Sequence, residues 1–190
     1  MILRWPGKVP AGKVENQLVS GLDWFPTFVA AAGNPNIIDE LKSSKQLGDR
    51  TYKVHLDGYN QTDLITDKGP SKRKEVYYFT EGTLSAVRIG DFKYRLTDQP
   101  NGWFGGTVKL DWPVLVNIRL DPFERTTVGQ SLFAKDWWTF EFWRFVFLQQ
   151  EVGKAAQTFL EFPPMQKGGS FNLEAVKEEL DKKMAAHASQ

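Results

Sequence analysis

The sequence contains no cysteine and only two histidines, His55 and His187, among its 190 residues. Without cysteine the chain can form no disulfide, no thiolate nucleophile and no cysteine-ligated metal site. Two histidines so far apart in sequence are too few to indicate a zinc site. Thiol chemistry is therefore excluded, and the redox compartment cannot be inferred from cysteine usage.

A strong excess of charge of one sign is also missing. The chain has 24 Lys and Arg against 23 Asp and Glu, for a formal net charge of +1. A nearly neutral chain has no global field to attract nucleic acid or an anionic membrane. The short basic run at residues 72–74 follows Gly69, Pro70 and Ser71, and we interpret it as a solvated loop.

Long apolar runs are absent as well. The most apolar run, residues 140–148, is interrupted by Glu141 and Arg144 and falls short of the roughly 20 residues that span a bilayer. The first residues do not resemble a secretory signal, because a proline follows a short apolar stretch. We expect no membrane span, and the abrupt start suggests that further sequence precedes this chain.

Hydrophobic periodicity and turn residues predict a mixed architecture. Asp23 suits the N-cap of a helix that stops at Gly33, and Gly90 with Asp91 suits the turn of a hairpin. The expected elements are a strand at 2–5, helices at 24–32 and 37–42, strands at 76–79, 84–89, 92–96 and 114–120, and helices at 137–150, 152–162 and 173–186, with a break near Gly153. This order predicts an α+β fold, with an antiparallel sheet of three to four strands packed against C-terminal helices.

Five segments, in order along nearly the whole chain, resemble the bacterial arylsulfatases. They are residues 2–9 with Gly12 (ILRWPGKV), 21–33 (GLDWFPT, ending in AG), 52–61 (YKVHLDGYNQ), 117–124 (NIRLDPFE) and 161–172 (EFPP, QK and SFN). Each alone is ordinary turn chemistry, but their joint order is specific. The chain therefore resembles the C-terminal region of a type I, formylglycine-dependent arylsulfatase of the alkaline phosphatase-like superfamily.

The resemblance implies a division of the chain and a parent activity. Residues 1–33 would end the large α/β domain of a sulfatase, and residues 34–190 would form its C-terminal subdomain. Such enzymes hydrolyse sulfate esters with a hydrated formylglycine, made from Cys or Ser in a C/S-x-P-x-R motif, and a calcium-type ion held by Asp and Asn oxygens. Neither that motif nor an acidic pair at the end of an apolar strand occurs in this sequence.

We therefore expect no catalytic residue, metal ligand or cofactor in this chain, which alone should not hydrolyse sulfate esters. The expected partners are the N-terminal sulfatase domain and, in the complete enzyme, the sulfate ester. The compartment implied by the family is periplasmic or extracellular.

Three residues are candidates for substrate binding. His55 either contacts the ester in a pocket or is a structural histidine bonded to the turn at Asp57 and Gly58. Asp57 either orients His55 or begins that turn. Trp103, in a glycine-rich loop, either stacks on an aryl or sugar ring or packs on the core.

Two other classes of protein remain open. Aromatic residues near Trp103 could make the chain a stand-alone module that binds carbohydrate or another ligand. Alternatively, the chain could be a non-catalytic scaffold that pairs with a separately encoded large domain. If the chain is instead a truncated sulfatase, an exposed apolar face should remain where the large domain docks, and the candidates for that face are Phe25, Phe28 and the aromatic run of residues 137–147.

Overall fold

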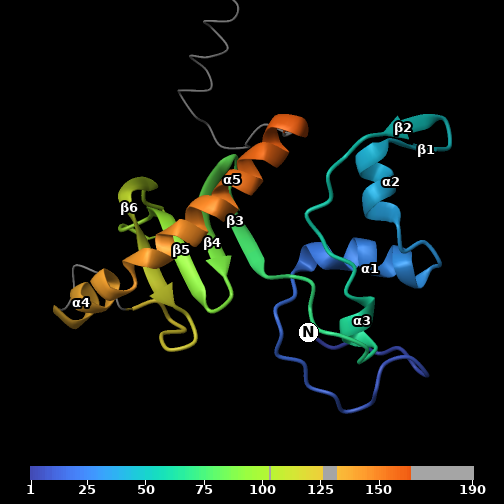
Figure 1. Ribbon diagram of the computed structural model, residues 1–190, viewed down its shortest axis with the longest axis horizontal. Coiled ribbons are helices and arrows are strands. Elements are labelled where there is room, and N and C mark those ends of the chain that lie inside the picture. Colours follow the sequence, from blue (N-terminus) through green and yellow to red (C-terminus); the bar gives the residue numbers. More distant parts are fainter. Residues whose placement is uncertain (103, 126–131, 164–190) are drawn as a thin grey trace, which may run out of the picture.

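The computed structural model describes residues 1–102, 104–125 and 132–163. These residues form two lobes that lie side by side (Figure 1). The sheet lobe, residues 75–163, is a four-stranded antiparallel sheet crossed on one face by the long helix α5 (Phe145–Glu161). The N-terminal lobe, residues 1–74, consists of short helices, one small hairpin and extended segments. The predicted α+β class with an antiparallel sheet and C-terminal helices is confirmed.

The N-terminal lobe contains six short elements. In chain order these are η1 (Gly21–Asp23), α1 (Trp24–Ala31), α2 (Ile37–Ser43), β1 (Lys45–Leu47), β2 (Arg50–Tyr52) and α3 (Thr62–Ile65). The predicted helices at 24–32 and 37–42 are confirmed. The hairpin of β1 and β2 was not predicted, because its six residues are mostly exposed and carry no apolar alternation.

The strand predicted at residues 2–5 is wrong. This segment pairs with no strand in the described structure, and the chain turns directly after it. The Trp5 carbonyl accepts hydrogen bonds from the amides of Lys8 and Val9, at 3.1 and 2.9 Å. Pro6 and Gly7, with Gly7 at a φ of 74°, impose that turn, as the sequence indicated.

The start of α1 differs from a simple N-cap. Ser20 and Asp23 form a reciprocal capping box around η1, with the Ser20 amide 2.9 Å from Asp23 Oδ2 and the Leu22 amide 3.3 Å from Ser20 Oγ. Asp23 occupies the N-cap position of α1 but makes no side-chain capping bond to that helix. Gly33, with a φ of 108°, ends the helix as predicted.

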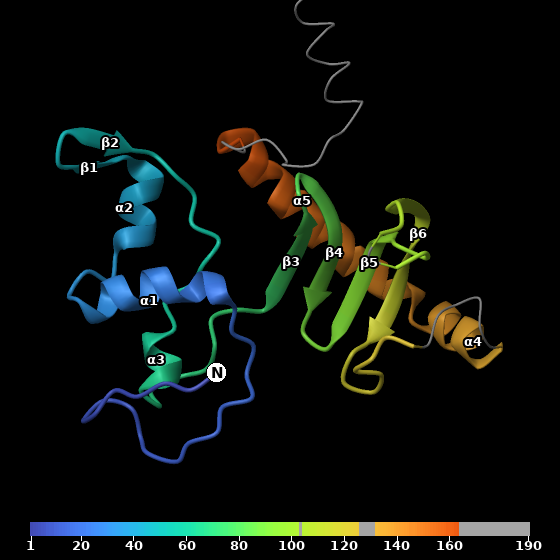
Figure 2. The ribbon, with the colours of Figure 1, turned by 180° about the vertical axis from the view of Figure 1, so that it is seen from behind.

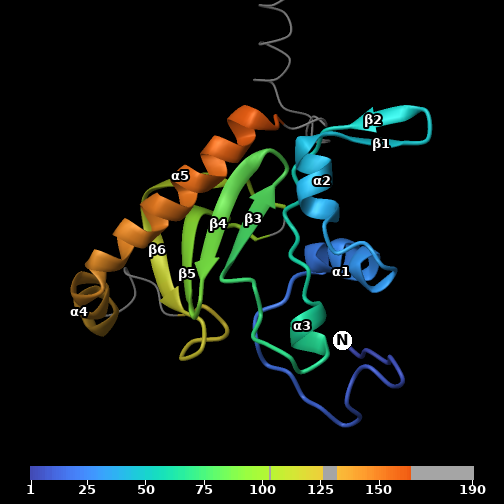
Figure 3. The ribbon, with the colours of Figure 1, turned by 45° about the vertical axis from the view of Figure 1, so that its right-hand side comes forward.

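The sheet has the strand order β3-β4-β5-β6. Its strands are β3 (Glu75–Thr80), β4 (Thr83–Ile89), β5 (Phe92–Asp98) and β6 (Val108–Asn117). The predicted hairpin turn at Gly90 and Asp91 is confirmed, since Ile89 pairs with Phe92 and Gly90 has a φ of 59°. Strand β3 forms the sheet edge nearest the N-terminal lobe (Figures 1 and 3).

Strand β6 begins earlier and ends sooner than the predicted strand at 114–120. Its first residues pair with Thr97 and Asp98 beyond a register shift, which lengthens the ladder. Its end is set by Asn117, whose side chain accepts from the Arg119 amide at 3.0 Å and turns the chain.

The helical boundaries after β6 also differ from the prediction. The elements are α4 (Leu132–Phe140), η2 (Phe142–Arg144) and α5, so the break lies before Phe145. Helix α5 runs through Gly153, where a break was expected. Glycine costs a helix about 1 kcal/mol, and the apolar face that includes Leu148 and Ala155 outweighs this cost. The predicted helix at 173–186 lies outside the described residues.

The core of the sheet lobe lies between the sheet and α5. One residue from each strand forms a row on the covered face: Tyr77, Val87, Tyr94 and Leu115. Phe145 and Leu148 of α5 pack against this row, and the rings of Tyr94 and Phe145 meet edge to face at 5.8 Å. Seen from behind, the strands lie in front and α5 behind them (Figure 2).

Aromatic side chains of the predicted docking face are exposed to solvent. Phe25 and Phe28 of the predicted docking face are 53% and 57% exposed, and Trp143 is 53% exposed. In the described part of the chain, no helix is both long and apolar enough to cross a membrane.

Candidate functional site

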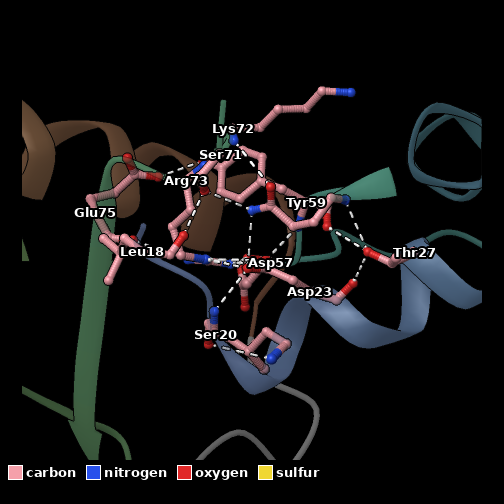
Figure 4. Close-up of polar contacts among 12 residues, drawn as sticks. Leu18, Ser20, Asp23, Thr27, Asp57, Tyr59, Ser71, Lys72, Arg73 and Glu75 are labelled. Carbon is pink, nitrogen blue, oxygen red and sulfur yellow. Dashed lines mark hydrogen bonds and ion pairs between the residues drawn. The ribbon is translucent and has the colours of Figure 1, made fainter. Parts of the chain in front are cut away.

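A buried ion pair joins the start of α1 to the last residues of the N-terminal lobe. Asp23 and Arg73 are 0% and 3% exposed. Arg73 donates from Nη2 to Asp23 Oδ1 at 2.6 Å and from Nε to Asp23 Oδ2 at 3.0 Å, which is a two-pronged contact (Figure 4). The interpretation of residues 72–74 as a solvated loop is therefore wrong for Arg73, whose partner 50 residues earlier gave no signal in the local sequence.

Further donors surround the Asp23 carboxylate. The amides of Tyr59 and Ser20 donate to it at 2.8 and 2.9 Å, and Gln61 Nε2 lies 3.3 Å away. Burial opposes ionisation of this carboxyl, but the hydrogen bonds from Arg73, Ser20 and Tyr59 outweigh burial and hold the pKa of Asp23 below its ordinary value. Asp23 is thus a charged, fully satisfied structural residue.

The same network fixes the YKVHLDGYNQ segment against α1. The Gln61 amide donates to Thr27 Oγ1 at 2.9 Å, and Gln61 Oε1 accepts from the Lys72 amide at 3.1 Å. Arg73 Nη2 also donates to the Asp57 carbonyl at 2.7 Å. Residues 57–61 are therefore held in place by backbone and side-chain bonds, although they form neither helix nor strand.

The backbone at Gly58 lies too close to α1 to leave room for a side chain. A Cβ at this position would lie 2.0 Å from the Leu22 carbonyl oxygen and 3.2 Å from Pro26 Cγ. Only glycine allows the segment to approach the start of α1 so closely.

This supported segment forms one wall of a cleft between the two lobes. The cleft has a volume of about 540 Å³, and we call it the His55 cleft. Its lining includes Leu22, His55, Asp57, Tyr59, Arg73, Glu75, Tyr77, Phe79, Glu151, Lys154 and Phe159. Two of the three predicted binding residues, His55 and Asp57, thus lie in one cleft.

A larger hollow, of about 900 Å³, lies beneath the first residues of the chain. Its charged lining residues are Arg4, Lys13 and Glu15, and Lys13 is bound to Asp67 at 2.6 Å. The His55 cleft offers a richer set of polar groups and is therefore the stronger candidate.

His55 and Asp57 contact each other within the cleft. Their Nδ1 and Oδ1 atoms are 3.1 Å apart, and the side chains are 28% and 69% exposed. The His55 ring also lies 5.6 Å from the Phe162 ring. With Nδ1 engaged by Asp57, Nε2 is the ring nitrogen available to a ligand.

The cleft also contains two tyrosine–glutamate pairs. The Tyr59 hydroxyl donates to Glu75 Oε1 at 2.5 Å, and Tyr77 Oη lies 3.3 Å from Glu151 Oε2. Burial, and then the neighbouring carboxylates, raise the pKa of both tyrosines, so both remain protonated donors. These residues offer hydroxyl and carboxylate groups that suit a hydroxyl-rich ligand. Sequence reasoning missed them because they come from segments far apart in the chain.

Trp103, the third predicted binding residue, lies outside the described residues. Its neighbour Phe104 is 100% exposed. Residues 164–172 of the fifth sulfatase-like segment are also outside them.

A calcium site does not fit the residues seen here. Across residues 1–102, 104–125 and 132–163, no group of three or more His, Asp or Glu side chains is placed to hold a metal ion. Calcium takes six to eight oxygen ligands, so no step is assigned to a metal in this chain.

Comparison with known proteins finds partial similarity to sulfatases. No family model matches the chain. It is 31% identical over 99 residues to N-acetylgalactosamine-6-sulfatase of Mus musculus, which covers 52% of the chain and 16% of that protein. It is 30% identical over 94 residues to human (Homo sapiens) arylsulfatase A, covering 47% of the chain and 15% of that protein.

A solved structure shares the fold. The PsFucS1 sulfatase from Pseudoalteromonas sp. matches 86% of the chain and 30% of its own chain, with a TM-score of 0.63 and 24% identity. The chain is therefore a relative of the sulfatases, as the five segments predicted. Its match spans about one-sixth of the curated relatives' length.

Proposed function

We propose that this chain is the C-terminal region of a sulfuric ester hydrolase, where it supports the catalytic domain and forms one wall of the substrate cleft. The observation that carries the proposal is the similarity to sulfatases, joined to a polar cleft that contains His55 and Asp57. The chain contributes no nucleophile, since it contains no cysteine and no Ser-x-P-x-R sequence.

The support rests on the buried ion pair. Asp23 and Arg73 hold the segment of residues 57–61 against α1, and that segment carries the polar wall of the His55 cleft. A rigid wall keeps ligand-contacting groups in place before the ligand arrives, which lowers the ordering cost of binding.

His55 is the proposed ligand contact. Its Nδ1 bond to Asp57 fixes the ring, and Nε2 then donates to the ester or to a neighbouring hydroxyl of the substrate. Positioning by such a contact strengthens binding without taking part in bond cleavage. The compartment we propose is periplasmic or extracellular, from the resemblance to sulfatases.

The role of His55 is tested in a protein that joins this chain to the coding sequence upstream of it. We expect His55→Gln to raise KM for a sulfate ester about three- to tenfold with a smaller change in kcat, as loss of one binding hydrogen bond does. The control is Asp63→Asn. Asp63 forms an exposed ion pair with Lys72 at 3.2 Å, and neither residue lines the His55 cleft. An unchanged KM in a folded His55→Gln protein contradicts the proposed cleft wall.

A further inference from the structure

A third pocket lies where the N-terminal lobe meets the turn between β4 and β5. Its volume is about 520 Å³, and Arg73 is the residue it shares with the His55 cleft. Its charged lining consists of Arg73, Lys74, Arg88, Arg119 and a single carboxylate, Asp91. We call it the basic pocket.

Arg73 does not contribute free charge to this pocket, because Asp23 neutralises it. The other three cations are weakly compensated. Asp91 and Arg119 are 3.9 Å apart at their closest charged atoms and are 48% and 74% exposed, so they form a loose surface pair.

Lys74 and Arg88 have hydrogen-bond donors that are available to a ligand. Arg88 uses Nε for a 2.8 Å hydrogen bond to the Gly90 carbonyl, which fixes the guanidinium beside the turn. Within the described part of the chain, the Arg88 Nη groups and Lys74 Nζ have no hydrogen-bond or ion-pair partner. Uncompensated like charges in one hollow repel each other, and a bound anion relieves that repulsion.

The walls of the basic pocket are held by hydrogen bonds from separate segments. The Gly90 amide donates to the Lys74 carbonyl at 3.0 Å, and the Ile118 amide donates to the Asp91 carbonyl at 2.9 Å. Gln17 Oε1 accepts from the Ser71 amide at 2.8 Å. These hydrogen bonds hold the backbone segments that carry the cations in place. Less conformational freedom is then lost when a small ligand binds.

We propose that the basic pocket binds a tetrahedral oxyanion, a sulfate or phosphate group, through Lys74, Arg88 and Arg119. An arginine fork matches two oxygens of such a group, and lysine adds a point charge. This inference concerns a site separate from the His55 cleft and does not depend on the proposed sulfatase role. The oxyanion is either a free ion or a group carried on a sugar.

The test is a titration of the isotope-labelled chain with sodium sulfate, with ionic strength held constant by sodium chloride. We expect saturable shifts of the Gly90, Asp91 and Ile118 amide resonances, and the same residues responding to phosphate. Lys74→Gln and Arg119→Gln should each weaken the apparent affinity about two- to fivefold, the range for exposed charge pairs. Both side chains are exposed, so the fold should persist, and the amide spectrum of each variant checks this.

The matched control is Lys13→Gln. Lys13 is a cation outside the linings of both the basic pocket and the His55 cleft and is paired with Asp67 at 2.6 Å, so its removal should leave sulfate binding unchanged. Shifts that do not saturate, or an affinity for sulfate that Lys13→Gln weakens as much as Lys74→Gln does, would overturn the proposal. Equal binding of acetate would also overturn it, because a carboxylate lacks the tetrahedral oxygens.

A further arm separates the two sources of the oxyanion. Tighter binding of a sulfated disaccharide than of inorganic sulfate, with no binding of the desulfated sugar, indicates a sugar-borne group. Equal binding of the two indicates a free ion. Because the isolated chain is used, failure here is distinguishable from failure of the His55 experiment.

Discussion

Asp23 shows how much one residue can depend on partners that are distant in sequence. Its position before a helix predicted an N-cap, yet its carboxylate binds Arg73, Tyr59 and Ser20 instead. Taking both charges out of water is costly, so the pair persists because each hydrogen-bonding group is satisfied. Removing one partner leaves the other charge buried and unpaired.

Asp23→Asn is therefore expected to lower the free energy of unfolding by about 3–5 kcal/mol. Urea denaturation followed by circular dichroism measures this. Asp63→Asn, which breaks the exposed pair with Lys72, should cost about 1 kcal/mol or less. A loss below about 1 kcal/mol for Asp23→Asn contradicts a structural role for the buried pair.

The pH dependence of stability follows from the same carboxylate. Because its pKa in the folded chain is lower than its ordinary value of 3.8, Asp23 adds stability above that pH, and this stability is lost as pH falls through the folded pKa. The stability difference between wild type and Asp23→Asn should stay constant from about pH 5 to 7 and narrow below about pH 4. A difference that grows on acidification contradicts the assignment.

A side chain at Gly58 is expected to destabilise the fold, because the backbone of Leu22 lies too close to accept one. Gly58→Ala places a methyl group 2.0 Å from the Leu22 carbonyl oxygen, so α1 or the 57–61 segment must move. We expect a loss of at least about 1–3 kcal/mol, measured by urea denaturation. Gly69→Ala is the control, because its Cβ would meet Asp63 Cβ at an ordinary 3.5 Å.

At the scale of elements, the sequence predicted the helices and turns that depend on neighbouring residues alone. The helix at residues 24–32 and the hairpin around Gly90 follow from apolar spacing and turn residues, and both are confirmed. The start of β6 and the run of α5 through Gly153 depend on tertiary pairing and packing, so no local pattern marked them. The β1–β2 hairpin was missed because it buries almost nothing.

Helix α5 is held to the sheet by its apolar face. Leu148→Ala removes a side chain that is 5% exposed and packed in the sheet core, and should cost about 2–5 kcal/mol of unfolding free energy. Leu160→Ala, on the same helix but 87% exposed, should cost less than about 0.5 kcal/mol. Equal losses in thermal or urea unfolding would show that α5 does not depend on this contact.

At the scale of the whole molecule, the sulfatase relationship was predictable but most of the cleft was not. His55 and Asp57 are two residues apart, so their contact could be inferred locally. Tyr77 and Glu151, which are distant in sequence, join them only through the fold. The docking face at Phe25, Phe28 and Trp143 remains a prediction, with all three residues more than half exposed.

We propose that this chain is part of a sulfatase and that it does not hydrolyse sulfate esters when alone. The most direct test is hydrolysis of p-nitrophenyl sulfate, with added calcium, by this chain alone and by the protein extended with its upstream coding sequence. The account predicts turnover by the extended protein and none by this chain. Turnover by this chain alone would contradict the account and make His55 the first residue to replace.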